Sequence, residues 1–277
     1  MSQELLSKLN TTHIDEISSS RNEPDWLKDY RRNSLSIYDS LPIETSPLYN
    51  KYTDAKKMDP EKVSLSITTT ETVPAFLQKR LSELDNEICI IQIGTNIHKI
   101  NLPDELKSQG VVISSISDAI QNNPELVKKA LDASNPKDDK FTALNNAAFN
   151  SGIFIHIPRN FVLDKPIHFL TCLSEDGHST ISRNIIFADE SSKSTLIQEL
   201  YSPNIQTQQA YLELMNTSVA ANAQLDITTL QMMDQHAVTF STKRTDLGQD
   251  AKVNWYSGLF GSMLSRYKIE YFLNGTG

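Results

Sequence analysis

The spacing of apolar and polar residues divides the chain into three parts. In residues 23–41 apolar side chains recur at helical spacing and form one stripe: Trp26, Tyr30, Ile37 and Leu41. This spacing predicts an amphipathic helix that docks through the stripe. Pro42 and Pro47 would end the helix. Residues 1–62 are therefore expected to form a helical segment followed by an irregular connector.

Residues 63–151 alternate short strand patterns with helical ones. We expect strands at three apolar runs: 63-VSLSI-67, 87-EICIIQI-93 and 110-GVVIS-114. Helices are expected around four segments: 74-PAFLQKRLSEL-84, 117-SDAIQ-121, 124-PELVKKAL-131 and 141-FTALNNAAF-149. Ser151 and Gly152 would end the last helix. The alternation predicts a small α/β region.

Residues 152–277 lose helical spacing, and short β-rich runs follow one another from 153-IFIHI-157 to 268-KIEYFL-273. Apolar positions repeat along this part. One set has successive spacings of 27, 26 and 29 residues: Phe187, Leu214, Phe240 and Ile269. A second set has spacings of 31 and 28 residues: Leu196, Ile227 and Trp255. Two strands per period of that length predict a coil that stacks on itself, a parallel β-helix. A meander of hairpins is the alternative.

Composition and charge narrow the function. The 277 residues are 39% hydrophobic and carry a formal net charge of −8, which predicts a globular chain that binds neither nucleic acid nor an anionic membrane. The N-terminus has no signal-peptide pattern, and no apolar run is long enough to span a membrane. We expect a cytoplasmic protein. Cys89 and Cys172 stand alone and are predicted to be buried thiols.

Two histidines in strand patterns and one Asp-Gly-His triplet are candidates for chemistry. His156 and His168 lie in strand patterns without the further ligand that a metal site needs, which favours surface or hydrogen-bonded histidines. The triplet 176-DGH-178 could hold a base and its orienting acid, but there is no G-x-S-x-G nucleophile motif for it to serve, so a turn is favoured.

Two further motifs are candidate binding sites. The strand before 94-GTN-96 lacks the glycines of a dinucleotide site. The run 242-TKRTD-246 could bind an anionic fragment, but two solvated cations at a strand end are the favoured interpretation.

Five segments in this order resemble the SufB/SufD family of iron–sulfur cluster assembly scaffolds: 32-RNSLSIYDSLP-42, 141-FTALNNAAFNSGIFIHIPRNFVLDKPI-167, 183-RNIIFADESSKSTLIQEL-200, 225-LDITTLQ-231 and 255-WYSGLFGSMLSRYKIEYFLNG-275. The resemblance covers residues 23–277. It is closer to SufD than to SufB, although 242-TKR-244 is found in SufB-like chains.

The resemblance fits the mixed α and β fold that the patterns predict: a helical segment (1–62), a small α/β region (63–151) and a β-helix core (152–277), which the repeat predicts to be incomplete at its C-terminus. It implies a non-catalytic scaffold that pairs with a SufB-like paralogue through the β-helix. A SufC-like ABC ATPase would bind a C-terminal segment absent from this sequence. No cofactor is expected in this chain, whereas the full complex would build a transient iron–sulfur cluster and is suggested to use reduced flavin.

The resemblance also suggests site residues. In SufB-like chains the residues matching Gln231 and Lys243 line a proposed path for sulfur, but Met233 stands where those chains prefer tryptophan. That difference puts a working path in doubt. The strands that carry the family's cluster cysteine and the facing histidine would lie beyond Gly277.

The repeat predicts another rung after 272-FLNGTG-277, so we expect an open end that self-associates or needs a partner. Two other functions stay open. A β-helix can carry a carbohydrate-active enzyme, for which Asp226 and Asp250 are the nearest acids, one on a strand and one in a turn. It can also serve as a purely structural interaction module.

Overall fold

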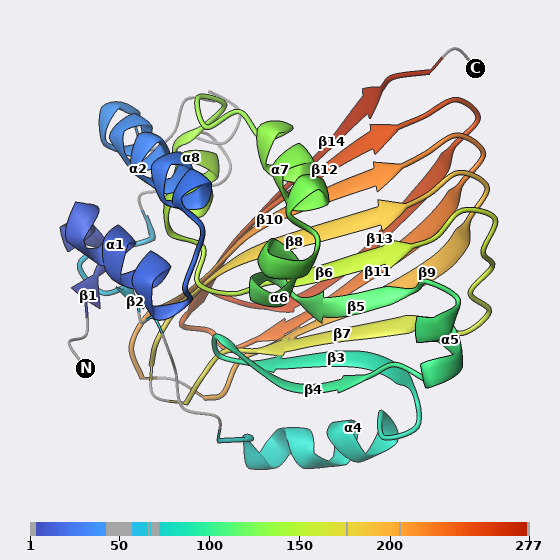
Figure 1. Ribbon diagram of the computed structural model, residues 1–277. Coiled ribbons are helices and arrows are strands. Elements are labelled where there is room, and N and C mark those ends of the chain that lie inside the picture. Colours follow the sequence, from blue (N-terminus) through green and yellow to red (C-terminus); the bar gives the residue numbers. More distant parts are fainter. Residues whose placement is uncertain are drawn as a thin grey trace.

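The computed structural model describes residues 4–42, 57–65, 67, 72–175, 177–204 and 206–275 (Figure 1). The helices of this part are η1 (Leu6–Lys8), α1 (Thr11–Ser20), α2 (Asp25–Ser40), η3 (Ala75–Leu77), α4 (Gln78–Glu83), α5 (Asp104–Ser108), α6 (Ile116–Asn122), α7 (Pro124–Asp132) and α8 (Lys140–Ala148). Among the described helices none is long and apolar enough to cross a membrane.

The strands of the first half are β1 (Glu4–Leu5), β2 (Ser64–Leu65), β3 (Ile88–Ile93), β4 (Asn96–Asn101) and β5 (Val112–Ser115). Those of the second half are β6 (Ile153–Ile157), β7 (Ile167–Cys172), β8 (Thr180–Ala188), β9 (Lys193–Tyr201), β10 (Gln209–Val219), β11 (Gln224–Met233), β12 (Ala237–Leu247), β13 (Lys252–Gly261) and β14 (Leu264–Leu273).

From β6 onward the chain alternates between two sheets and stacks each strand on the one two positions earlier. The first sheet has the order β14-β12-β10-β8-β6-β5 and the second the order β13-β11-β9-β7-β3-β4. All pairs among β6–β14 are parallel. The predicted parallel β-helix is confirmed, and a meander of hairpins, which needs antiparallel neighbours, is wrong.

The register tests the two predicted repeats. Leu196, Ile227 and Trp255 lie side by side on β9, β11 and β13, so this repeat is correct. The other set is wrong, because Phe240 pairs with Leu212 and Arg266 in place of the predicted partners. Strands buried on both faces carry apolar residues at odd and even positions, so sequence spacing alone left the register ambiguous.

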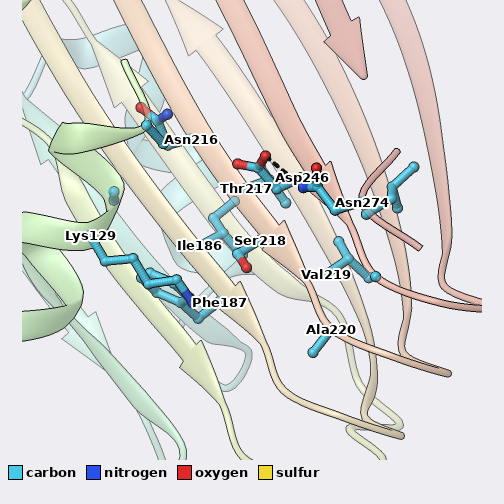
Figure 2. Close-up of a pocket in the computed structure, with 14 residues that line it drawn as sticks. Lys129, Ile186, Phe187, Asn216, Thr217, Ser218, Val219, Ala220, Asp246 and Asn274 are labelled. Carbon is cyan, nitrogen blue, oxygen red and sulfur yellow. Dashed lines mark hydrogen bonds between the residues drawn. The ribbon is translucent and has the colours of Figure 1, made fainter. Parts of the chain in front are cut away.

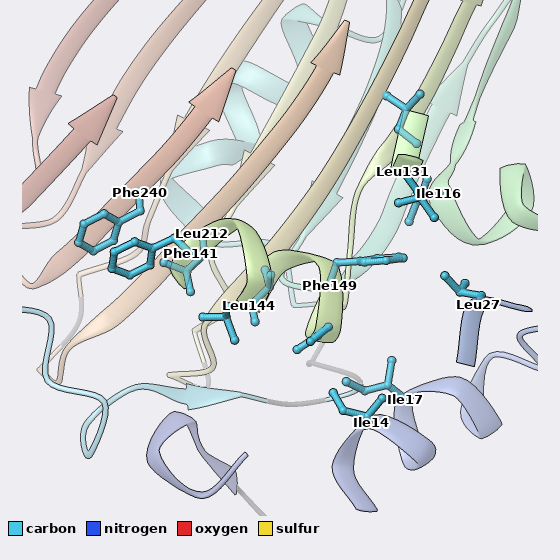
Figure 3. Close-up of a cluster of buried hydrophobic side chains, with 14 of the residues drawn as sticks. Ile14, Ile17, Leu27, Ile116, Leu131, Phe141, Leu144, Phe149, Leu212 and Phe240 are labelled. Carbon is cyan, nitrogen blue, oxygen red and sulfur yellow. The ribbon is translucent and has the colours of Figure 1, made fainter. Parts of the chain in front are cut away.

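Helices cover the outer face of the first sheet, which explains why that sheet is apolar on both sides. Helix α8 packs against β8 and β10 and against α1 and α2. Figure 3 shows the contact, where Phe141 of α8 stacks on Phe240 of β12 with ring centroids 4.2 Å apart and Leu212 lies beside them. The shared cluster joins the helices to the solenoid.

The first predicted helix exists, but its buried face differs from the predicted stripe. Helix α2 buries Leu27, Arg31, Ser34 and Leu35, whereas Trp26, Tyr30 and Ile37 lie beside that face and are only partly buried. Arg31 belongs inside because Glu23 binds its guanidinium at 2.8 and 2.7 Å. A pattern search that counts only apolar residues cannot detect a buried ion pair.

Strands of residues 63–151 join the solenoid sheets. β3 pairs in parallel with β7, and β5 pairs antiparallel with β6. The structure contains the strands predicted at 87–93 and 110–114 and the four helices predicted in this region. It also contains three elements that the sequence analysis did not predict: β4, α5 and, nearer the N-terminus, α1. Of the strand predicted at 63–67 the structure has β2, which pairs with β1. Pro47 and most of the predicted connector lie outside the described residues.

Candidate functional site in the solenoid interior

A line of polar side chains runs through the interior of the solenoid. Alternate residues of a strand point to one face of its sheet, and toward the interior these strands present both aliphatic and polar side chains. The polar ones come from five consecutive strands and from β14: Asn184, Gln198, Glu213, Thr229, Gln231, Ser241, Lys243 and Tyr267. Buried polar groups are stable only when they bond one another.

Lys243 lies in the middle of β12 with its side chain fully buried. Its Nζ donates to Gln198 Oε1 at 2.7 Å and to Thr229 Oγ1 at 2.6 Å. The ammonium also lies 4.8 Å from the centre of the Trp255 ring, a cation–π distance. Burial lowers the pKa of Lys243 to about 8, although the nearby Glu213 raises it.

Glu213 on β10 is the acceptor that most of these groups share. Its Oε1 accepts from Asn184 at 2.7 Å, Gln198 at 2.5 Å and Tyr211 at 3.2 Å. Its Oε2 accepts from Ser241 at 2.5 Å. Four donors satisfy the buried carboxylate, which would otherwise be costly to hold away from water.

Gln231 continues the line toward β14. Its Nε2 donates to Ser265 Oγ at 2.9 Å, and its Oε1 accepts from the Tyr267 hydroxyl at 3.0 Å. The Tyr267 ring centre lies 5.7 Å from Lys243 Nζ. The fold therefore brings the two candidates Gln231 and Lys243 into one interior, on either side of Tyr267. Burial raises the pKa of Tyr267 far enough to keep its hydroxyl protonated.

The run 242–246 differs from its prediction. Lys243 and Arg244 are 0% and 7% exposed, so the expectation of two solvated cations at a strand end is wrong. Their strand lies between β10 and β14, and side chains cover it on both faces. Arg244 points outward and donates to Asp138 Oδ2 at 2.5 Å. Each cation thus bonds to side chains from other elements of the fold, which the local sequence does not reveal.

Met233 is also buried, and the Thr239 hydroxyl donates to its Sδ at 3.2 Å. Sequence reasoning missed Glu213, Gln198, Thr229 and Tyr267. The available signal was a set of polar residues at alternate positions of otherwise apolar strands. These side chains come together only when the strands of both sheets are in the correct register, and the apolar repeat predicted that register correctly for the second sheet alone.

The two candidate histidines, His156 on β6 and His168 on β7, each lie beside a carboxylate. His156 Nε2 lies 2.8 Å from Asp189 Oδ2, and His168 Nδ1 lies 3.6 Å from Glu199 Oε1. His178 approaches Ser64 Oγ at 3.4 Å, and Asp176 of the same triplet lies outside the described residues. No group of three or more potential ligands among the described residues could hold a metal ion.

The cysteines and the 94–96 turn have structural roles. Cys89 and Cys172 are buried in one apolar cluster beneath α4, and burial raises the pKa of both thiols. They are therefore poor nucleophiles at neutral pH. Gly94 has a φ of 58° and lies in the turn that joins the antiparallel strands β3 and β4.

The outer surface carries a cavity of about 390 Å³ between α7 and the first sheet (Figure 2). Lys129 lies on its helical side, and Asp246, which accepts from Asn274 at 3.1 Å, lies on its sheet side. The acids weighed for an enzyme lie apart: Asp226 is on β11, bonded to Asn254 at 2.7 Å, and Asp250 is in the corner before β13.

The fold and the interior define a parallel β-solenoid protein with a buried polar axis and a helical cover. Residues 8–169 match the family model of the SufBD protein N-terminal region. Residues 171–277 match the model described as SUF system FeS cluster assembly, SufBD core domain. The chain belongs to the SufBD family.

Relatives of this chain carry the same family description. Iron–sulfur cluster assembly SufBD family proteins of Staphylococcus aureus strains MRSA252 and USA300 are each 27% identical to it over 280 residues. The corresponding protein of Staphylococcus saprophyticus is 26% identical. In each case the match covers 95% of this chain and 59% of the relative, so the chain spans about three fifths of the curated relatives it matches.

Proposed function

We propose that this chain is a scaffold subunit of a SUF-type iron–sulfur cluster assembly complex and that it acts in the cytoplasm. Membership of the SufBD family supports the assembly role. The proposed partners are a SufB-like paralogue, which would bind the β-helix, and a SufC-like ATPase. The iron–sulfur cluster is the cargo of that complex, and this chain does no chemistry by itself.

The observation that carries the proposal is the buried line from Glu213 through Lys243 to Gln231. The polar groups of this interior are the Lys243 ammonium, the Gln231 amide and the hydroxyls of Thr229 and Tyr267. Each of them can donate a hydrogen bond to an anion, so together they can bind an anionic sulfur species. Aliphatic side chains alone would serve the fold equally well. The chain keeps Lys243 and Gln231 fully buried among polar neighbours, a costly arrangement without a function.

We further propose that the chain is SufD-like. Met233 is buried two residues after Gln231 on β11, and a thioether cannot donate a hydrogen bond as an indole can. The path would therefore be incomplete here, as suits a supporting subunit. We assign no resident flavin to the solenoid interior, since the polar groups there bond to each other at 2.5–3.2 Å.

Co-expression tests both levels of the proposal. The chain would carry the affinity tag, and a SufB-like paralogue and a SufC-like ATPase would be produced with it. We expect the paralogue to co-purify, with iron and sulfide bound to the complex. Recovery of neither partner would contradict the scaffold role.

The Lys243→Met variant separates SufD-like from SufB-like behaviour. For a supporting subunit we expect the complex to keep most of its sulfide, whereas a working path through this chain predicts a severalfold loss. Thr217→Val, on the interior face of β10, is the matched control because its hydroxyl has no hydrogen-bond partner in the described structure.

No observation favours the carbohydrate-active alternative. Asp226 is on the outward face of β11 and its carboxylate binds Asn254. Asp250 is exposed in a corner. Two carboxylates that flank a glycosidic bond must face one substrate site. Asp226 is on the strand β11, whereas Asp250 is in the corner before β13.

A further inference from the structure

The hydrogen bonds around Glu213 have a direction that follows from its being a carboxylate. An ionised carboxylate only accepts, so Gln198 must turn its Nε2 toward Glu213 Oε1, 2.5 Å away. The same orientation presents Gln198 Oε1 to Lys243 Nζ at 2.7 Å and to the Thr229 hydroxyl at 2.9 Å. Glu213 therefore determines which atom of Gln198 faces Lys243.

The two buried charges also compensate each other. Lys243 Nζ and Glu213 Oε2 are 3.9 Å apart, and both side chains are fully buried. The other titratable groups on this side are Tyr211, bonded to Glu213, and Tyr267, and burial raises the pKa of each phenol. Both are therefore neutral at physiological pH. Among the described residues, Glu213 is the carboxylate within ion-pair distance of Lys243.

Removing the Glu213 carboxylate would affect both the orientation of the Gln198 amide and the charge balance around Lys243. A glutamine at 213 would offer one oxygen and one amide group to four donors, so at least one donor would meet an N–H. If Gln198 turned to relieve that conflict, it would direct its own N–H groups at the Lys243 ammonium. A buried ammonium without a counter-charge is strongly unfavourable and tends to lose its proton.

We propose that Glu213 is a positioning residue for Lys243: it keeps the ammonium charged and, through Gln198, holds Nζ on the interior line beside Gln231 and Tyr267. This role deepens the proposed function, since a charged Lys243 can attract an anionic sulfur species and a neutral amine cannot. The charge state itself is a property of this chain, so it can be measured without any partner.

The test is a pH titration of lysine side-chain resonances by NMR in the full chain. The signal of Lys243 is assigned by its disappearance in Lys243→Met. We expect a midpoint near the pKa of about 8 in the unsubstituted protein. In Glu213→Gln the protonation constant of Lys243 should fall tenfold or more, as for a group that loses an opposite charge within about 4–6 Å.

Thr217→Val is the control for this titration, because Thr217 is buried on the interior face of β10, the strand of Glu213, and its hydroxyl has no hydrogen-bond partner among the described residues. It should leave the Lys243 midpoint unchanged. An equal midpoint in Glu213→Gln and the unsubstituted protein would overturn the proposal. So would an equal fall in the control.

Thermal unfolding gives a second readout if Glu213→Gln proves too unstable for NMR. That variant leaves a buried cation uncompensated, so adding Lys243→Met should raise its melting temperature or restore folding. Strictly additive losses would contradict the coupling. Neither readout depends on partners or clusters, so a failed co-purification would reject the proposed function without affecting this inference.

Discussion

At the residue scale, one glycine determines how closely the chain after α8 approaches strand β8 of the solenoid. Gly152, between α8 and β6, has a φ of 141°, and a Cβ added there would lie 1.9 Å from the carbonyl oxygen of Arg183. A contact of that kind cannot be relieved by rotating a side chain, because the neighbouring atom belongs to the backbone. Gly152 therefore allows the helical cover to enter the first rung of the solenoid.

Gly152→Ala is predicted to destabilise the protein by at least about 2 kcal/mol, because it combines backbone strain with a backbone clash. Gly177→Ala is the matched control: Gly177 also has a positive φ, of 85°, but among the described residues, its chain neighbours aside, no atom lies within 4 Å of its added Cβ. Denaturant unfolding of both variants separates the clash from the strain. Equal losses would show that the close approach to Arg183 has no energetic effect.

At the scale of elements, an ion-pair network attaches α4 to the second sheet. Glu199 on β9 binds Arg80 of α4 at 2.9 and 2.6 Å and accepts from the Tyr201 hydroxyl at 2.9 Å. Burial would raise the pKa of Glu199, but bonds with His168, Arg80 and Tyr201 outweigh it and bring the pKa to about 2. The network therefore favours the ionised carboxylate in the folded state.

A folded-state pKa below the ordinary value means that Glu199 stabilises the fold above about pH 4.5 and loses this effect as the pH falls toward 2. Glu199→Gln should cost roughly 3 kcal/mol at neutral pH, and the difference from the unsubstituted protein should shrink on acidification. Urea unfolding between pH 3 and 7 measures it. The control is Glu83→Gln, which removes the exposed ion pair of the same Arg80 and should change the free energy of unfolding little. If the loss of stability in Glu199→Gln did not depend on pH, the low pKa assigned to Glu199 would be contradicted.

At the scale of the whole molecule, the last two strands expose apolar side chains. Tyr256 and Phe260 on the outward face of β13 are 57% and 62% exposed, and Leu273 on β14 is 76% exposed. Within the described structure β13 and β14 each pair on one side only. Unpaired strands with exposed apolar residues are sites of association.

We therefore predict that the isolated chain self-associates at micromolar concentration. The double variant Tyr256→Glu and Phe260→Glu should shift sedimentation toward the monomer, because it places charges on the apolar part of β13. Lys252→Glu changes the charge of the same outward face by the same amount at an exposed polar position opposite Gln224 and is the control. Monomeric behaviour of the unsubstituted chain over a wide concentration range would show the prediction to be wrong.

Several features could be predicted from the sequence by itself. Successive short β-rich runs and the recurrence of Leu196, Ile227 and Trp255 were enough to predict a parallel β-helix, since these are local properties that the rungs repeat. The helices around 117–149 followed from their spacing. Five ordered segments indicated the family. Each of these inferences needs only the neighbours of a residue along the chain.

Only the tertiary structure decided what the polar residues do. Lys243 looked like a solvated cation because a run of two basic residues and an acid normally faces water, yet β10 and β14 enclose its strand. For Glu213 and Gln198 the only local signal was a polar side chain in an otherwise apolar strand. Apart from Tyr211, their partners lie 15–45 residues away, and the register that brings them together depends on corner lengths that differ between rungs. Burial and pairing across rungs are properties of the stacked coil, which no single strand contains.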